Sequence, residues 1–216
     1  MPPPRRAPEP VSRDQSECHV VHSDIEVKFW AQAVPSAERV RPPRCPRCKV
    51  AARPFGGRLE VVGHGLRERQ VRGLLQPGRP ARLVVVHVRR FRCLACSAVI
   101  TVVPAGIAVR RHFGAGTIAL ALARFGGSGD SVRHIREQLG GVGPPEDGAW
   151  VTLRRWGDAV RRGTLFPRLR AVPIARARSR AARAATILST YAEPALSGTP
   201  FEEQVFAGAV RLALAA

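Results

Sequence analysis

The first half of the chain carries short apolar runs with the two-residue period of β-strands. The clearest lies in residues 82–92, a nearly continuous run of leucine and valine that turns basic at its end. Such a run is expected where both faces of a strand are covered. Weaker strands are predicted at residues 59–62 and 99–103. Residues 70–75 are expected to pair with the first of these across a turn at residues 63–65, where glycine provides the backbone freedom.

From residue 112 onward the apolar spacing lengthens to about 3.6 residues, the period of an α-helix. Three short helices are predicted. Gly126-Gly127 is expected to end the first, and Asp130 or Ser131 to cap the second. Gly140-Gly141 ends the second helix, and Asp147 caps the third. Their inward apolar positions are Ile118, Ala121, Leu122 and Phe125, then Val132, Ile135 and Leu139, then Ala149, Leu153, Trp156 and Val160.

The two ends of the chain have weaker patterns. Residues 1–17 are rich in proline and polar side chains, so disorder is expected there. Residues 20–34 indicate only a short strand or helix. Residues 175–191 and 201–214 are predicted to be helical.

The chain of 216 residues has 35 basic and 16 acidic side chains, a net charge of +19. Its excess of arginine over lysine is also compatible with a GC-rich genome. However, the charge is concentrated in residues 39–111, where Glu60 and Glu68 are the acidic residues. Such a surface attracts a polyanion, and nucleic acid is the commonest one available to a soluble protein. No stretch approaches the roughly 20 apolar residues of a membrane span, and residues 1–6 lack the apolar core of a secretory signal. A cytoplasmic location without membrane contact is therefore expected.

Four of the five cysteines stand in two matched Cys-x-x-Cys pairs, Cys45 with Cys48 and Cys93 with Cys96. Each pair aims two thiolates at one point, and together they supply the four soft ligands of a tetrahedral zinc ion. Thiols stay reduced in the cytosol, which favours metal binding over disulfides. Four protein ligands leave no open coordination position, so the predicted zinc is structural. Cys18 is either an extra ligand or an incidental thiol.

Basic side chains flank the cysteines and recur on the third predicted helix. Phosphate contact is expected from about half of the arginines near the cysteines, the alternative being a solvated strand face. Strand alternation places Arg90 and Arg92 opposite Arg89. Base contacts are expected from the third helix, although plain helix packing is the alternative for it. The candidate nucleic-acid-binding residues are Arg67, Arg69, Arg89, Arg90, Arg92, Thr152, Arg154, Arg155 and Arg161.

Four segments together resemble a known arrangement. They are Cys-Pro-x-Cys at 45–48, Gly-His-Gly-Leu-Arg-Glu-Arg at 63–69, Val-Arg-Arg-Phe-Arg-Cys-x-x-Cys at 88–96 and Thr-Leu-Arg-Arg-Trp at 152–156. Over residues 40–163 the chain is similar to the zinc-ribbon and helix-turn-helix front end of bacterial insertion-sequence transposases, and to short bacterial proteins of the same layout. In that family the front end binds the ends of the element. A separate nuclease-like domain with three metal-binding carboxylates cuts the DNA.

The resemblance implies double-stranded DNA as the partner, but not strand transfer. After Val160 the acidic residues are Glu193, Glu202 and Glu203, and the remaining length cannot form a nuclease-like domain. No enzymatic activity is therefore expected, and a remnant or domesticated end-binding module, located with the nucleoid, is the predicted function. An RNA- or ribosome-associated zinc-ribbon protein, and a transposase subunit acting with a separate catalytic chain, are the alternatives.

The predicted fold class is α+β, a small β zinc ribbon followed by a three-helix helix-turn-helix bundle and a helical tail. Residues 1–38 are expected to be an irregular lead segment, and 39–111 the zinc ribbon. Residues 112–163 are the predicted helix-turn-helix, and 164–216 a basic linker with C-terminal helices. We also consider a homodimer, because one such helix alone would read only a short DNA site.

Overall fold

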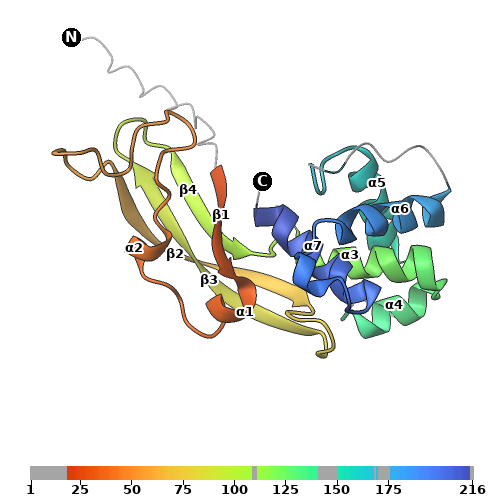
Figure 1. The fold of residues 1–216 in the computed structure, drawn as a ribbon. Coiled ribbons are helices and arrows are strands. Elements are labelled where there is room, and N and C mark those ends of the chain that lie inside the picture. The colour runs from red at the N-terminus through yellow and green to blue at the C-terminus, as the bar shows by residue number, and fades with distance from the viewer. Residues whose placement is uncertain (1–18, 109–110, 141–149, 168, 170–175, 215–216) are drawn as a thin grey trace, which may run out of the picture.

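The computed structural model describes residues 19–108, 111–140, 150–167, 169 and 176–214. Figure 1 shows a mixed α/β molecule, with a four-stranded sheet at one end and a cluster of helices at the other. Each part has its own hydrophobic core. The order along the chain, strands first and then helices, follows the change of apolar period near residue 112.

The sheet consists of β1 (His19–Glu26), β2 (Val61–Gly73), β3 (Arg82–Cys93) and β4 (Val99–Ala105), in the order β1-β4-β3-β2. β3 is antiparallel to both β2 and β4, whereas β1 runs parallel to β4. The short strand or helix expected in residues 20–34 is therefore present as an edge strand. Part of the segment predicted to be irregular belongs to the sheet, because β4 is buried almost throughout and needs a partner on its outer side.

The hairpin predicted between residues 59–62 and 70–75 is wrong. The glycines of its expected turn lie inside one long strand, β2, which pairs with β3 from Val61 to Gly73. The register shifts between Gly63 and Leu66, so these residues form a bulge, and Gly65 has a positive φ of 84° there. Pairing along all of β3 thus outweighs the local turn preference of the two glycines.

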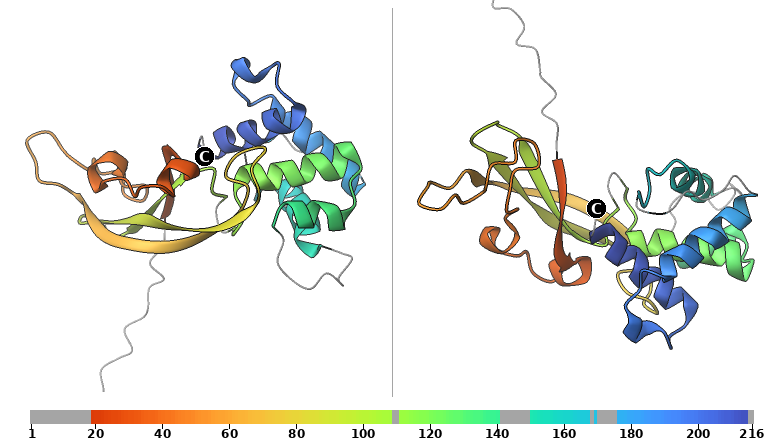
Figure 2. Two further views of the ribbon diagram at one scale, coloured as in Figure 1. Left: turned by 90° about the horizontal axis from the view of Figure 1, so that it is seen from below. Right: turned by 45° about the horizontal axis from the view of Figure 1, so that its top comes forward.

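β3 begins at Arg82 as predicted, but β4 extends past the expected stop at Pro104 to Ala105. Pro104 lies where the register between β1 and β4 shifts, so its missing N–H group falls outside the regular ladder. Two short helices, α1 (Val27–Trp30) and α2 (Ala37–Val40), cover one face of the curved sheet (Figure 2).

The core beneath these helices centres on Trp30, which is 1% exposed and donates a hydrogen bond from Nε1 to the carbonyl oxygen of His87 at 2.9 Å. The Arg41 guanidinium lies over the ring of Phe91, with 5.4 Å to the centroid. These contacts place Phe91 on the α1–α2 side of β3.

The helices of the second part are α3 (Ala115–Ala123), α4 (Val132–Gln138), α5 (Val151–Arg161), α6 (Ala177–Ser189) and α7 (Phe201–Leu214). α3 is buried along its whole length, and the other helices pack around it. Ser131 caps α4 as predicted, accepting the His134 N–H at 3.2 Å. α3 does not stop at Gly126-Gly127: it continues as a π-helical turn, and Gly129, with φ of 72°, ends it. Asp147, predicted to cap the third helix, and Ala149 lie outside the described residues.

The C-terminal helices are not a tail. α6 and α7 contribute buried side chains, among them Leu188 and Val205, to the same core as α3 and α5. Two glycines allow this close approach. A Cβ added to Gly208 would lie 1.9 Å from the Leu188 carbonyl oxygen, and one added to Gly126 would lie 2.1 Å from the Ala182 nitrogen. The predicted three-helix bundle with an appended tail is corrected to one cluster of α3 to α7.

The sheet and the helical cluster meet at a buried junction. Thr117 Oγ1 of α3 accepts the Leu74 N–H at 3.0 Å and donates to the Leu74 carbonyl oxygen at 3.1 Å. Gly73, with φ of 101°, leaves room for this threonine, because an added Cβ would lie 2.4 Å from the threonine side chain. The Arg72 N–H donates to the His112 carbonyl oxygen at 2.6 Å. The two parts are therefore joined by main-chain hydrogen bonds as well as by packing.

Candidate metal centre

The two cysteine pairs occupy matching turns, which we call knuckles and define as residues 45–50 and 93–98. The first lies between Arg44 and Ala51, which form an isolated β-bridge, and the second connects β3 to β4. In each knuckle the N–H of the first cysteine donates to the carbonyl oxygen of the residue five positions later. The carbonyl oxygen of the same cysteine accepts the N–H of the residue four positions later. The hydrogen bonds are Cys45 to Val50 at 2.9 Å, Lys49 to Cys45 at 2.9 Å, Cys93 to Ala98 at 3.0 Å and Ser97 to Cys93 at 2.9 Å.

The four Sγ atoms lie within 4.8 Å of one another. Cys45 and Cys96 are 3.7 Å apart, and Cys48 and Cys93 are 3.6 Å apart. A disulfide has an S–S distance of about 2.05 Å, so these are separate thiols. Four sulfurs at about 2.3 Å from a tetrahedral zinc ion lie about 3.8 Å apart. The predicted ligands are thus close enough to hold a metal ion, and their spacing is compatible with zinc.

The surroundings of the thiols oppose full ionisation without a cation. Burial raises the pKa of the Cys93 thiol to about 12. Burial also acts on Cys45, but hydrogen bonds from the N–H groups of Cys48 and Arg47 outweigh it and hold the pKa of that thiol at about 7. A bound divalent cation would supply the charge that keeps all four sulfurs deprotonated. Binding of a metal ion at this site would therefore release protons, and its affinity would fall as the pH is lowered.

A strained residue follows the second cysteine of each knuckle: Lys49 has φ of 64° and Ser97 has φ of 59°. Side chains with a Cβ are disfavoured in this left-handed region, β-branched ones most of all.

We expect Ser97→Val to lower the free energy of unfolding of the zinc-loaded protein by about 1–2 kcal/mol, since a β-branched residue strains this conformation. Ser97→Gly should not lower it. Ala95→Val, in the same knuckle and also exposed, is the control. Urea unfolding at fixed zinc concentration measures the three effects, and equal losses for Ser97→Val and Ala95→Val would contradict the prediction.

The arginines of β2 and β3 are divided between the two faces of the sheet. Arg89 Nε donates to the Pro35 carbonyl oxygen at 2.8 Å, on the side of α1 and α2. Arg90 pairs with Thr101, which lines a pocket of about 360 Å³ on the opposite face together with Arg67 and Arg69. Paired residues on neighbouring strands share a face, so Arg90 lies on the Thr101 side.

Main-chain carbonyl oxygens engage two of the candidate arginines. Besides Arg89, Arg69 Nη2 donates to the carbonyl oxygens of Ala108 at 3.0 Å and Arg111 at 3.3 Å. Burial lowers the pKa of Arg69, with a further contribution from Arg67. Arg69 and Arg89 therefore have a structural role, because their side chains hold neighbouring segments to the sheet. Arg67 and Arg92 are exposed.

The remaining candidates lie on α5, in the helical cluster and so apart from the sheet (Figure 1). Arg154, Arg155 and Arg161 are exposed and Thr152 is half-buried, whereas Leu153, Trp156, Ala159 and Val160 are buried. Trp156 packs edge-on against Trp150 and Phe113, with ring centroids 5.0 Å and 5.1 Å away. α5 thus presents a basic outer side over an aromatic inner side.

Sequence reasoning missed Arg111 and His112, which also line the pocket on the Thr101 face, as does the acidic Glu68. In the sequence these two basic residues directly precede the first predicted helix. They reach the pocket only because the segment that carries them hydrogen-bonds to β2, where the Arg72 N–H donates to the His112 carbonyl oxygen. Cys18 lies outside the described residues.

Comparison of the chain with protein-family models, curated proteins and solved structures found no match. Among the helices of the described residues, none combines the length and apolar character that crossing a membrane requires.

Proposed function

We propose that the chain is a zinc-stabilised protein that binds double-stranded DNA and has no catalytic role. The observation that carries the proposal is the four-cysteine cluster at the end of β3, the strand that also bears Arg89, Arg90 and Arg92. Zinc is the metal proposed, because four thiolates in a tetrahedral arrangement are its usual structural ligands. Such an ion acts as a structural support and leaves the chemistry of recognition to the surrounding surface.

The charge of the chain supports nucleic acid as the partner. A net charge of +19 on 216 residues gives a strong non-specific attraction for phosphate. On α5, the exposed Arg154 and Arg155 project from a helix whose other side is anchored in the core, which suits contact with base edges in a major groove. The resemblance to transposase front ends indicates that the DNA bound would be the end of an insertion element. The protein would then be a remnant or domesticated end-binding module.

The test is fluorescence anisotropy of a labelled duplex with the zinc-loaded chain over a range of salt concentrations. If about five phosphates are contacted, the slope of log K against log [salt] should be about −4 to −5. Structured RNA is added as a competitor, since RNA binding is the alternative function. A folded, zinc-loaded protein that does not bind duplex at low salt, or that releases duplex to equimolar RNA, would contradict the proposal.

Variants then separate the two kinds of contact. Arg154→Gln should weaken binding to a preferred sequence about 5- to 150-fold with less effect on random duplex, as expected of base contact. Arg67→Gln should weaken both about equally and reduce the salt slope by about 1. Arg211→Gln is the control, because this exposed arginine of α7 lines a pocket with Asp24 and Glu26, whose charges repel phosphate.

A further inference from the structure

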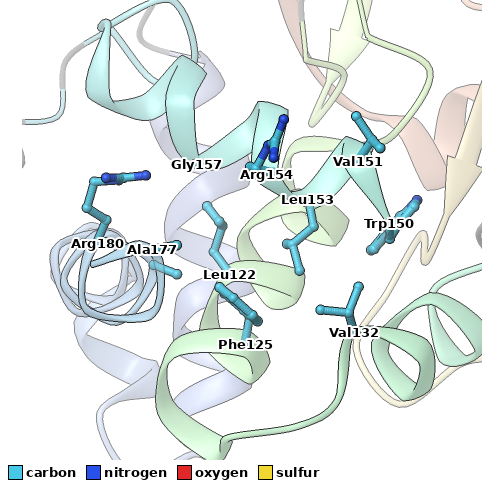
Figure 3. A pocket seen from close by; sticks show the side chains of 11 residues that line it. Leu122, Phe125, Val132, Trp150, Val151, Leu153, Arg154, Gly157, Ala177 and Arg180 are labelled. Carbon is cyan, nitrogen blue, oxygen red and sulfur yellow. The ribbon is translucent and has the colours of Figure 1, made fainter. Parts of the chain in front are cut away.

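The inner side of α5 borders a second pocket, of about 270 Å³, which lies between α5, the end of α3 and the start of α6. Figure 3 shows apolar side chains turned towards its interior, with Leu122 and Phe125 from the α3 side and Leu153 from α5. Arg154 and Arg180 line it as well, from α5 and α6 respectively.

Gly157, in the middle of α5, forms part of the pocket wall. Apart from its chain neighbours and the nearby backbone of α5 itself, no heavy atom lies within 4 Å of the position that its Cβ would occupy. Packing explains three other glycines of the helical cluster, because an added Cβ would lie 2.5 Å from Phe206 at Gly116, 2.1 Å from Ala182 at Gly126 and 1.9 Å from Leu188 at Gly208. Gly157 has no such neighbour, although glycine in a helix interior lowers stability relative to alanine.

A glycine in this place exposes the backbone of α5 to whatever enters the pocket. Close approach of a ligand to the main chain is one of the few structural uses of glycine inside a helix. The packing of the protein's own side chains does not require Gly157, so its role is sought in the pocket itself.

The charges around the pocket favour a negatively charged ligand. Arg154 and Arg180 bring two guanidinium groups, and Arg180 has a side chain that is only 16% exposed. Asp158, beside Gly157, accepts a hydrogen bond from Arg180 Nη2 at 3.4 Å and contributes one negative charge. The described lining residues include no aspartate or glutamate. The pocket therefore combines apolar walls with a net positive charge.

We propose that this pocket binds a small aromatic carboxylate, with its ring against Leu122, Phe125 and Leu153 and its carboxylate towards Arg154 and Arg180. A cavity of roughly 150 Å³ admits a benzene molecule, so about 270 Å³ admits a ring with a short acidic chain. Guanidinium groups bind carboxylates through charge-assisted hydrogen bonds, and apolar walls remove the ring from water. Arg154 is also a proposed DNA contact, so the ligand site is tested without DNA; the cavity itself and its other lining residues do not depend on a nucleic-acid contact.

The test uses 3-phenylpropionate as the probe and the zinc-loaded full chain, with ligand-observed NMR and no DNA present. A Kd of about 0.1–1 mM is expected for a ligand of this size. The uncharged analogue 3-phenylpropanamide should bind at least about tenfold more weakly, because it loses the charge-assisted contact. Equal binding of the acid and the amide, or no binding of either at several millimolar, would overturn the proposal.

Two variants locate the probe. Gly157→Leu places a side chain in the pocket and should abolish binding, and the near-UV circular dichroism of Trp150 and Trp156 checks that the cluster stays folded. Arg154→Gln should weaken binding of the acid about 3- to 10-fold. Arg162→Gln removes the same charge from an exposed residue at the end of α5 that does not line the pocket, and should leave binding of the probe unchanged. Full binding to the folded Gly157→Leu protein would place the probe elsewhere and refute the assignment.

Discussion

Replacing Cys93 by serine is expected to weaken zinc binding severely and to destabilise the sheet. Cys93 is fully buried, pairs with Val61 at the start of β2, and begins the knuckle that leads into β4. A structural zinc ion contributes on the order of 10 kcal/mol to folding, which equals the whole stability of a typical domain. Three remaining ligands hold the ion more weakly and leave the β2, β3 and β4 ends without their common anchor.

Metal content by elemental analysis and thermal unfolding by circular dichroism measure this effect, with and without a chelator. Ala95→Ser adds a hydroxyl to the same knuckle without touching a ligand, and should retain about one zinc per chain and an unchanged Tm. A Cys93→Ser protein with full zinc content and the Tm of the unmodified chain would disprove the role assigned to the cluster.

The second large effect is expected at Gly208. Gly208→Ala places a methyl group 1.9 Å from the Leu188 carbonyl oxygen, so α6 and α7 must separate. Because a backbone atom cannot rotate away, the loss in the free energy of unfolding should be about 3 kcal/mol or more, the upper end for overpacked sites. The identical change at Gly157, where the added methyl meets open space, should instead raise that free energy by about 0.5–1 kcal/mol.

The two glycine variants control for each other, since both exchange glycine for alanine inside a helix. Urea unfolding, followed by the fluorescence of the tryptophans at fixed zinc concentration, gives both values. A Gly208→Ala protein that is as stable as the unmodified chain would contradict the close contact of α6 and α7, and a destabilised Gly157→Ala protein would contradict the open space at Gly157.

Local patterns in the sequence predicted the elements that depend on local chemistry. The Ser131 cap, the start of β3 at Arg82 and the extent of α7 are all as predicted, because capping groups and apolar spacing determine them. The four cysteines were identified from spacing alone, since two Cys-x-x-Cys turns can share one ion wherever the chain brings them together.

The larger failures involve partners distant in sequence. Gly63 and Gly65 have the residue type of a turn, and only the extent of β3 turns them into a bulge. β1 gains its place from parallel pairing with β4, some 80 residues away in sequence, which no local period encodes. Similarly, α6 and α7 looked like a tail because their apolar stripes do not specify a partner. Their partner, α3, is buried on every side.

The junction at Thr117 and Leu74 has a consequence for any large ligand that contacts both parts of the molecule. Modules joined by a flexible linker must each lose rotational freedom when they bind, and their joint affinity depends on linker length. Here the hydrogen-bonded junction has already fixed the orientation of α5 relative to β2 and β3 during folding. Once one part of the molecule has bound such a ligand, contact by the other part therefore requires no further loss of rigid-body entropy. The same rigidity restricts binding to ligands whose geometry matches the fixed orientation of the two parts.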